Sequence, residues 1–286
     1  MNRIFNIKRF GRYLKSDIRS CTADYGLSLM LISLMGVIIY IGTILMGLIF
    51  NGTWEGPGVG FRLTAFAVCM FVLVVTMPVK CYGKITAKKE GSDWLMVPVA
   101  KTEKFLSMVI MTVFIVPVVS AGTYLCLDAI TCAIDKTCGE SLISSFGSLI
   151  VNFFGMTATV YSEAGAVPGL QEFIRQVSNP LLYVDDIIGM CLIFLLGAIV
   201  FKTGKTAKTF LAFFLITSVL GLIMTPVITH YFGEFAVQFQ TKPQMTGDIF
   251  NLGIFRHVAL FDTINDTLVN LALMAGIYYR IKTLKH

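Results

Sequence analysis

The clearest pattern in the chain is a series of long apolar runs with few or no charged residues. Five stand out, namely Leu27 to Phe50, Leu63 to Val79, Phe105 to Leu127, Leu181 to Phe201 and Thr209 to Gly233. A sixth, His257 to Tyr279, carries Asp262 and Asp266 in its first half. A bilayer core of about 30 Å requires roughly 20 apolar residues per helix. The pattern therefore predicts an all-α polytopic membrane protein with six transmembrane helices, in which residues 1–286 form a single transmembrane domain.

The basic residues fall mostly on one side of this predicted topology. Eighteen of the 23 Lys and Arg residues precede the first run, follow the sixth, or lie between runs two and three or four and five. Cytoplasmic loops beside membrane helices are enriched in Lys and Arg. We therefore expect a multi-pass protein of the cell membrane, a bacterial inner membrane, with both termini in the cytoplasm.

Composition supports this class and excludes others. Hydrophobic residues make up 56% of the chain and charged residues 14%, and the mean hydropathy is +0.77. Soluble domains carry about 25% charged residues, so a soluble enzyme, a disordered tail and a secreted disulfide scaffold are excluded. The net charge of +6 is explained by the membrane topology, and we expect membrane lipid rather than nucleic acid as a partner.

Two sizeable segments are predicted on the outer side, residues 128–180 and 232–255. The first contains an uncharged stretch of 22 residues, Ser141 to Ser162, of which ten are Ser, Thr, Asn or Gly. A seventh span here would move the later basic residues to the other side of the membrane. We therefore interpret it as a re-entrant or interfacial segment, with a true span as the alternative.

The first 24 residues have the pattern of an amphipathic helix. At about 100° per residue, one stripe contains Ile4, Ile7, Phe10, Leu14 and Ile18, and a second contains Lys8, Arg12, Lys15 and Arg19. Such a helix lies among lipid headgroups with its basic side chains reaching anionic lipid. It is either a surface anchor that sets the topology or an elbow helix that frames a transporter half and leads into its first span.

The longest predicted cytoplasmic connection is segment 81–104. Gly91 and Pro98 enclose a short apolar stretch, Trp94-Leu95-Met96-Val97, that is costly to leave in water. The bilayer surface, the protein's own helices or a soluble partner should therefore cover it. After it, Thr102 is predicted to cap the next helix, with Glu103 at the positive end of the helix dipole.

These features together resemble the permease half of an ABC-2-type transporter. The stretch Gly-Ser-Asp-Trp-Leu-Met-Val-Pro at 91–98, followed by Glu103-Lys104-Phe105-Leu106-Ser107, is similar to small permease-like membrane proteins of gut Bacteroidetes. The resemblance implies that two halves pair as a homo- or heterodimer and that a coupling helix after span two binds a separate ATP-binding subunit. The residues it assigns to that contact are Gly91, Asp93, Trp94, Leu95, Met96, Pro98, Glu103 and Lys104. In the family a re-entrant hairpin lies between spans five and six, whereas here the longest outer segment lies between spans three and four.

The function expected from this resemblance is transport of an unknown substrate, driven by the ATP-binding subunit. The chain itself is expected to be neither an enzyme nor a cofactor-binding protein. Gly204-Lys205-Thr206 is similar to the end of a phosphate-binding loop, but Ile199 stands where that motif requires glycine. The alternative is a non-transporting membrane scaffold or assembly factor that recruits a cytoplasmic partner.

Two further groups are weaker candidates. The residues Arg256, His257, Asp262 and Asp266 form either an intramembrane polar site or a solvated loop, if span six begins near Thr267. The three histidines lack the spacing of metal ligands, and no metal site is expected. In the first outer segment, Cys132 and Cys138 form either a disulfide or two free thiols.

Overall fold

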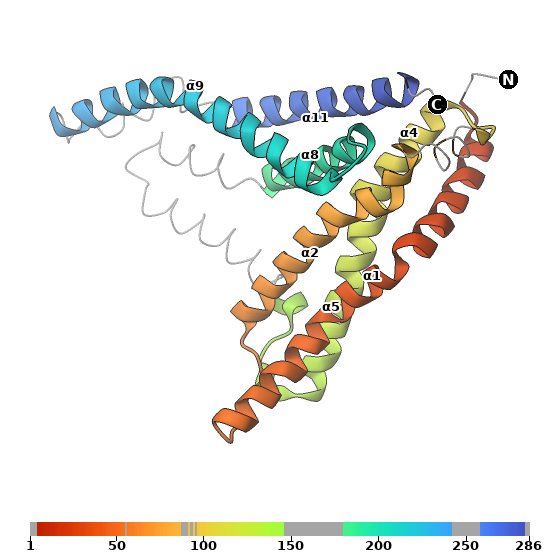
Figure 1. The fold of residues 1–286 in the computed structure, drawn as a ribbon. Helices are drawn as coiled ribbons and strands as arrows, with labels where there is room; N and C mark the ends of the chain where they lie inside the picture. The colour runs from red at the N-terminus through yellow and green to blue at the C-terminus, as the bar shows by residue number, and fades with distance from the viewer. Residues whose placement is uncertain are drawn as a thin grey trace. The chain divides into compact units, whose positions relative to one another are not determined.

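The computed structural model describes residues 5–54, 56–86, 91, 94, 96–145, 180–241 and 258–283. Every regular element in these ranges is helical, which confirms the all-α class (Figure 1). The longer helices are α1 (Ile7–Phe50), α2 (Val59–Tyr82), α4 (Lys101–Ile110), α5 (Val116–Ile134), α8 (Pro180–Val200), α9 (Lys205–Thr241) and α11 (Val258–Thr283). Short elements are the 3₁₀ helices η1 (Gly83–Thr86) and η3 (Lys136–Cys138), and the π-helical turn η2 (Met111–Ile115).

Four stretches of the described residues are long and apolar enough to cross a membrane. They are Ile7–Phe50, Val59–Thr86, Lys101–Ile134 and Lys205–Ile223, and they fit a membrane protein. The first three contain the predicted spans one to three, and the fourth contains the beginning of predicted span five. Helices α8 and α11 coincide with predicted spans four and six. The count of six spans stays a prediction.

Helix α1 is one continuous element of 44 residues. The sequence predicted a separate amphipathic elbow helix over residues 1–24, and its described part is instead the first portion of α1. The physical reason is that no proline interrupts residues 7–50, so the helix propagates cooperatively from its N-terminus. The Asn6 side chain caps that N-terminus by accepting hydrogen bonds from the backbone N–H groups of Lys8 and Arg9.

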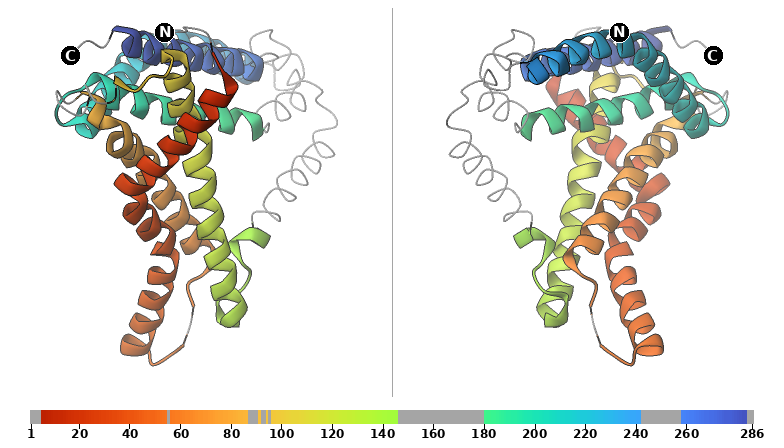
Figure 2. Two further views of the ribbon diagram at one scale, coloured as in Figure 1. Left: turned by 90° about the vertical axis from the view of Figure 1, so that its right-hand side faces the viewer. Right: turned by 90° about the vertical axis from the view of Figure 1, so that its left-hand side faces the viewer.

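The chain divides into two compact units, residues 1–148, 190–206 and 273–286, and residues 149–189 and 207–272. In the first unit, α1, α2 and α5 lie side by side in both views of Figure 2. Tyr124 of α5 packs edge-on against Phe66 of α2, with ring centroids 5.2 Å apart, and its ring lies 3.0 Å from where a side chain on Gly36 of α1 would begin. A larger residue than glycine at position 36 would separate α1 from α5.

The helix between α4 and α5 is widened into the π-helical turn η2 immediately before Pro117. Proline has no N–H to donate to the preceding turn, and its ring collides with the carbonyl four residues earlier. A π turn accommodates this within a continuous helix.

A buried ion pair joins α2 to α5 at the end of the bundle where α1 ends and α2 begins, here called the distal end (residues 50–62 and 128–145). Arg62 is only 5% exposed, and its Nη1 lies 2.8 Å from Oδ1 of Asp128. Its Nη2 donates to the carbonyl oxygens of Cys138 and Glu140. The other Asp128 oxygen accepts from the backbone N–H of Leu142 at 2.7 Å. One arginine and one aspartate thus hold α2, α5 and the chain after η3 together.

Cys132 and Cys138 are free cysteines, so the disulfide considered for them is not formed. Each sulfur has a different neighbour. Sγ of Cys132 lies 2.7 Å from Nη1 of Arg62, whereas Sγ of Cys138 lies 2.5 Å from where a Cβ on Gly56 would stand. Only glycine at position 56 leaves room for this thiol.

Asp135, just after α5, organises the exposed part of the distal end. One carboxylate oxygen accepts from Tyr40 Oη at 2.8 Å and from Trp54 Nε1 at 3.0 Å. The other accepts from the backbone N–H and the hydroxyl of Thr137. These donors, the Thr137 backbone N–H foremost, lower the pKa of Asp135 from 3.8 to about 2.

The Arg62–Asp128 pair yields a stability prediction. Asp128→Ala leaves a buried guanidinium without its counter-charge, which typically costs about 3–5 kcal/mol. We expect the free energy of unfolding in lipid–detergent micelles to fall by about that amount. Asp24→Ala is the matched control, because the Lys84–Asp24 pair is largely exposed and should contribute about 1 kcal/mol or less. Equal losses in the two variants would contradict the assignment.

The Asp135 contacts yield a pH prediction. Because the pKa is depressed in the folded state, its contribution is complete above the ordinary pKa near 4 and is lost as the pH falls toward 2. The chain has two tryptophans, so Trp94→Phe leaves Trp54 as the only indole reporter. We expect its fluorescence to be constant from pH 7 to about 4 and to change between about 4 and 2. Adding Asp135→Asn should remove that transition.

Candidate functional site

The first part of α1 contacts both ends of segment 81–104. These contacts lie at what we call the basic end, residues 5–25, 80–86 and 91–108, where the start of α1, the end of α2 and α4 come together (Figures 1 and 2). Segment 81–104 is the feature that carries the resemblance to a transporter subunit. We therefore treat the basic end as the candidate functional site.

The beginning of the segment is held to α1 by two polar contacts. Tyr82, the last residue of α2, is buried and donates its hydroxyl to Oδ2 of Asp17 at 3.0 Å. Two residues later, Nζ of Lys84 lies 2.7 Å from Oδ1 of Asp24. The chain therefore leaves α2 along the surface of α1 rather than away from it.

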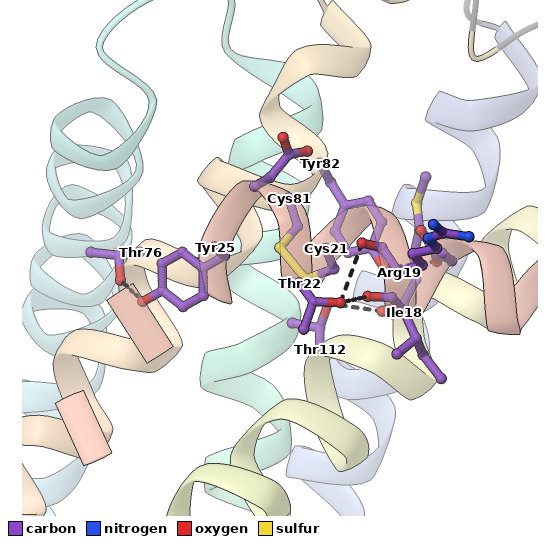
Figure 3. Close-up of a disulfide and its surroundings, with 12 residues drawn as sticks. Ile18, Arg19, Cys21, Thr22, Tyr25, Thr76, Cys81, Tyr82 and Thr112 are labelled. Atoms are coloured by element: carbon purple, nitrogen blue, oxygen red, sulfur yellow. Dashed lines mark hydrogen bonds between the residues drawn. A yellow bond between two sulfur atoms is a disulfide. The ribbon is translucent and has the colours of Figure 1, made fainter. Parts of the chain in front are cut away.

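A disulfide joins the same two helices. Cys21 and Cys81 are bonded, with their Cα atoms 5.2 Å apart (Figure 3). Cys21 lies one helical turn after Asp17 and one turn before Tyr25, whose hydroxyl is 2.5 Å from Oγ1 of Thr76. Residues four apart share a helix face. The α1–α2 contact is thus a stripe in which a disulfide lies between two hydrogen-bonded pairs.

The end of the segment is held to α1 through Glu103, which is fully buried. Arg9 binds it with two donors, Nε at 2.8 Å from Oε2 and Nη2 at 2.6 Å from Oε1. The backbone N–H groups of Asn6 and Ala100 also donate to this carboxylate. One side chain therefore contacts the first residues of α1 and closes the N-terminus of α4.

The cap of α4 differs from the sequence prediction. The helix begins at Lys101 and its N-cap is Ala100, not Thr102. The reason is that Glu103 occupies the third helical position, from which its side chain reaches back to the Ala100 N–H. Alanine has no side-chain acceptor, so the glutamate supplies the only side-chain cap that this terminus shows.

Asp17 connects the two ends of the segment to each other. Its Oδ2 accepts from Tyr82 at 3.0 Å and from the Ser107 hydroxyl at 2.5 Å. Tyr82 lies at the beginning of the segment, and Ser107 lies in α4 just after the segment ends. A single carboxylate oxygen therefore binds residues on both sides of the segment. We call the α1 residues Asn6, Arg9, Asp17, Cys21 and Asp24, with their bonded partners, the clamp.

The middle of the segment is part covered and part exposed. Nζ of Lys104 lies 4.5 Å from the centroid of the Trp94 ring and donates to the Trp94 carbonyl at 2.7 Å. This cation–π contact keeps Trp94 half-buried against the protein. Met96, in contrast, is 76% exposed, and Val97 is also exposed. Among the described residues in the middle of the segment, Met96, Val97 and Pro98 are therefore more accessible than Trp94.

Lys205, the first residue of α9 and part of the same compact unit, adds a further contact to the segment. Its Nζ donates to the carbonyl of Gly83 and to Oγ1 of Thr86. A Cβ on Gly83 would lie 3.2 Å from that ammonium nitrogen. Lys205, which belongs to the Gly204-Lys205-Thr206 stretch, thus fixes η1 by contacting its first and last residues.

The predicted site residues have different outcomes. Glu103 and Lys104 are buried, so they position the segment rather than touch a partner directly. Gly91 is buried, Pro98 is exposed, and Asp93 and Leu95 lie outside the described residues. The basic stripe of α1 is exposed throughout, at Lys8, Arg12, Lys15 and Arg19.

The predicted intramembrane polar site is described only in part. Arg256 and His257 lie outside the described residues, and Asp262 and Asp266 lie in α11. One turn after Asp266, the buried Asn270 donates to the Asp185 carbonyl at 3.1 Å, and Thr267 donates to its carboxylate. Within the described ranges, no group of three or more His, Cys, Asp or Glu could hold a metal ion.

Sequence reasoning missed most of the clamp. Asp17 and Cys21 lie within the first 24 residues, which the sequence predicts as an amphipathic helix, and Cys81 lies at the start of segment 81–104, so nothing in the prediction paired them. A signal was present in the spacing, because Asp17, Cys21 and Tyr25 recur every four residues and so lie along one face of α1. The partners of that face are 51 to 90 residues away in the chain, so no local pattern identifies them.

Neither a family model, nor a curated protein, nor a solved structure matches the chain. The resemblance to ABC-2 permeases therefore stays an expectation from the sequence pattern.

The clamp yields a prediction about Glu103. Glu103→Gln removes the charge that Arg9 binds and weakens the two backbone hydrogen bonds, so the first turns of α1 should open more often. In detergent micelles, we expect trypsin to cleave after Lys8, Arg9 and Arg12 about tenfold faster than in the parent protein. A tenfold change corresponds to a loss of roughly 1.4 kcal/mol in the free energy of local opening. The control is cleavage after Lys136 at the distal end, which should not change. Unchanged cleavage at the N-terminus would show that Glu103 does not hold it.

Proposed function

We propose that this chain is the membrane-spanning permease subunit of an ABC-2-type transporter and that its basic end couples it to a separate ATP-binding subunit. The observation that supports this best is the clamp, because α1 holds both ends of segment 81–104 while Met96 and Val97 remain exposed. A partner that contacts those two residues would push on α1, α2 and α4 together.

The chemistry of the exposed surface favours a soluble protein partner with an apolar groove. Met96 and Val97 are apolar side chains at the end of the bundle that carries Lys80, Lys84 and Lys101. Burial of apolar surface contributes about 25 cal/mol per Å², and methionine adapts to irregular grooves. The lysines at this end suit acidic residues at the rim of such a groove.

The buried residues of the segment explain how a contact would be transmitted. Lys104 joins Trp94 to α4, and Glu103 joins α4 to Arg9 of α1. These links are short and partly buried, so a displacement of Trp94 or Met96 would be carried into the helices rather than absorbed by the loop. The two charged residues thus act as positioning residues in the proposed function.

The proposed mechanism is mechanical. Closure of a pair of ATP-binding subunits would push the segment of each half, and the helices of the two permease halves would change their packing to open a pathway. The π turn η2 before Pro117 lies in the helix that the segment enters, and π turns are common where helices adjust. Six spans, cytoplasmic termini and a dimer belong to the same proposal.

The test is a photo-cross-linker placed at position 96 in the full-length protein in native membranes. We expect an adduct with an ATP-binding protein, identified by mass spectrometry, whose ATPase rate depends on this chain. Met96→Asp should reduce that ATPase stimulation at least about tenfold, because a buried unpaired charge is strongly unfavourable at an interface.

Ile7→Asp is the matched control, because Ile7 is as exposed as Met96 and lies at the same end but outside the segment. Its ATPase stimulation should equal that of the parent protein. Adducts with lipid alone would overturn the docking assignment. An adduct with a partner that binds no ATP would overturn the permease proposal. It would favour the alternative function, a scaffold or assembly factor that recruits a protein without transport.

A further inference from the structure

The Cys21–Cys81 bond is placed where it controls the beginning of segment 81–104. Cys81 is the next-to-last residue of α2, and the chain turns into η1 two residues later. At the other end of the segment, α4 is held by Glu103, which is not a neighbour of the disulfide in sequence or in the α1 stripe. One end of the segment is therefore held by a reducible covalent bond together with the Tyr82–Asp17 and Lys84–Asp24 contacts, and the other end is held by an ion pair.

The α1–α2 contact does not depend on the disulfide alone. On one side of it lies the Tyr82–Asp17 hydrogen bond. On the other side lies the Tyr25–Thr76 hydrogen bond, which is drawn in Figure 3. Breaking the S–S bond would leave both pairs in place. Reduction is thus expected to loosen the segment's beginning without unfolding the bundle.

The surroundings of the pair favour exchange with an external thiol. Cys21 is buried, whereas Cys81 is partly exposed, so an incoming thiolate can reach one sulfur of the two. The predicted topology puts this end in the cytoplasm, where disulfides are rare and those present are mostly transient or redox-sensing.

We propose that Cys21 and Cys81 are a reversible oxidation site, at which a thiol reductant of the glutathione or dithiol-protein class releases the beginning of segment 81–104 from α1. This regulation rests on the proposed function, because it acts on the segment assigned to docking. Oxidation adds a covalent link at the segment's beginning, and reduction leaves this end held to α1 by the Tyr82–Asp17 and Lys84–Asp24 contacts alone, so that η1 opens more often.

The reaction balances with two thiols. A reductant thiolate attacks Sγ of Cys81, a mixed disulfide forms, the S–S bond to Cys21 breaks, and the Cys21 thiolate takes up a proton. A second reductant thiol then attacks the reductant's own sulfur in the mixed disulfide, which releases Cys81 as a thiol. The protein gains two electrons and two protons, and the reductant leaves as its disulfide. Oxidation by a disulfide of the same class is the reverse.

The first experiment measures the redox state in living cells by differential alkylation and mass spectrometry of the full-length protein. Free thiols are blocked with N-ethylmaleimide, disulfides are then reduced, and the newly freed thiols are labelled with a second reagent. We expect residues 21 and 81 to be mostly reduced in unstressed cells and joined after diamide treatment. The buried cysteines Cys69 and Cys191 have no disulfide partner and are internal controls that should not change.

The second experiment measures the structural consequence on the purified full-length protein in detergent micelles. Trypsin cleavage after Lys84 should be about tenfold faster in the reduced protein than in the oxidised one, and Cys21→Ser/Cys81→Ser should behave like the reduced form under both conditions. Cys69→Ser is the matched control and should retain the redox difference. Cleavage after Lys136 should be equal throughout.

Two results would overturn the proposal. One is a pair that stays oxidised in unstressed cells and resists a membrane-permeant thiol, which would mark a permanent bond on an oxidising side of the membrane. The other is equal cleavage after Lys84 in both redox states. Failure of the docking assignment is seen separately, as loss of the ATP-binding adduct at position 96, and leaves both redox measurements unaffected.

Discussion

Helices in a bilayer gain little by exchanging lipid for apolar side chains, because lipid tails are as apolar as leucine. This constraint gives the polar contacts at the two ends of the α1–α2–α5 bundle a large share in its specificity. At the distal end, Arg62 and Asp128 join α2 to α5. At the basic end, Asp17 and Glu103 join α1 to α2 and α4. Between these ends, many apolar side chains of α1 face outward, as expected of a surface in lipid.

Polar groups at helix ends need hydrogen-bond partners, and the clamp supplies them at the N-terminus of α4. The same contacts hold both ends of segment 81–104 in place. The same glutamate that closes the N-terminus of α4 binds the first residues of α1. Helix capping and helix–helix attachment are therefore one interaction. The consequence is a loop with both ends held and a small apolar surface left exposed, which is the arrangement that a docking segment requires if force is to pass from a partner into helices.

The elements of the fold were largely accessible from the sequence, and the contacts between them were not. Apolar runs located α1, α2, α4–α5, α8 and α9 because span length is set by bilayer thickness. The N-terminus differed, since a stripe of basic and apolar residues looks the same whether the helix ends at residue 24 or continues to Phe50. Trp94 and Met96 were recognised as one apolar stretch, and only the position of Lys104 separated a covered residue from an exposed one.

By itself, the sequence determined the helical class and the apolar stretches that fit a membrane protein. Both follow from hydropathy and charge, which are properties of single residues summed over short windows. Tertiary structure decided which carboxylate binds which donor. It paired Cys21 with Cys81 rather than Cys132 with Cys138, and it joined Asp17 to residues 65 and 90 positions later. Such pairs depend on how two helices approach each other, and that geometry is set by packing along their whole length rather than by any local pattern.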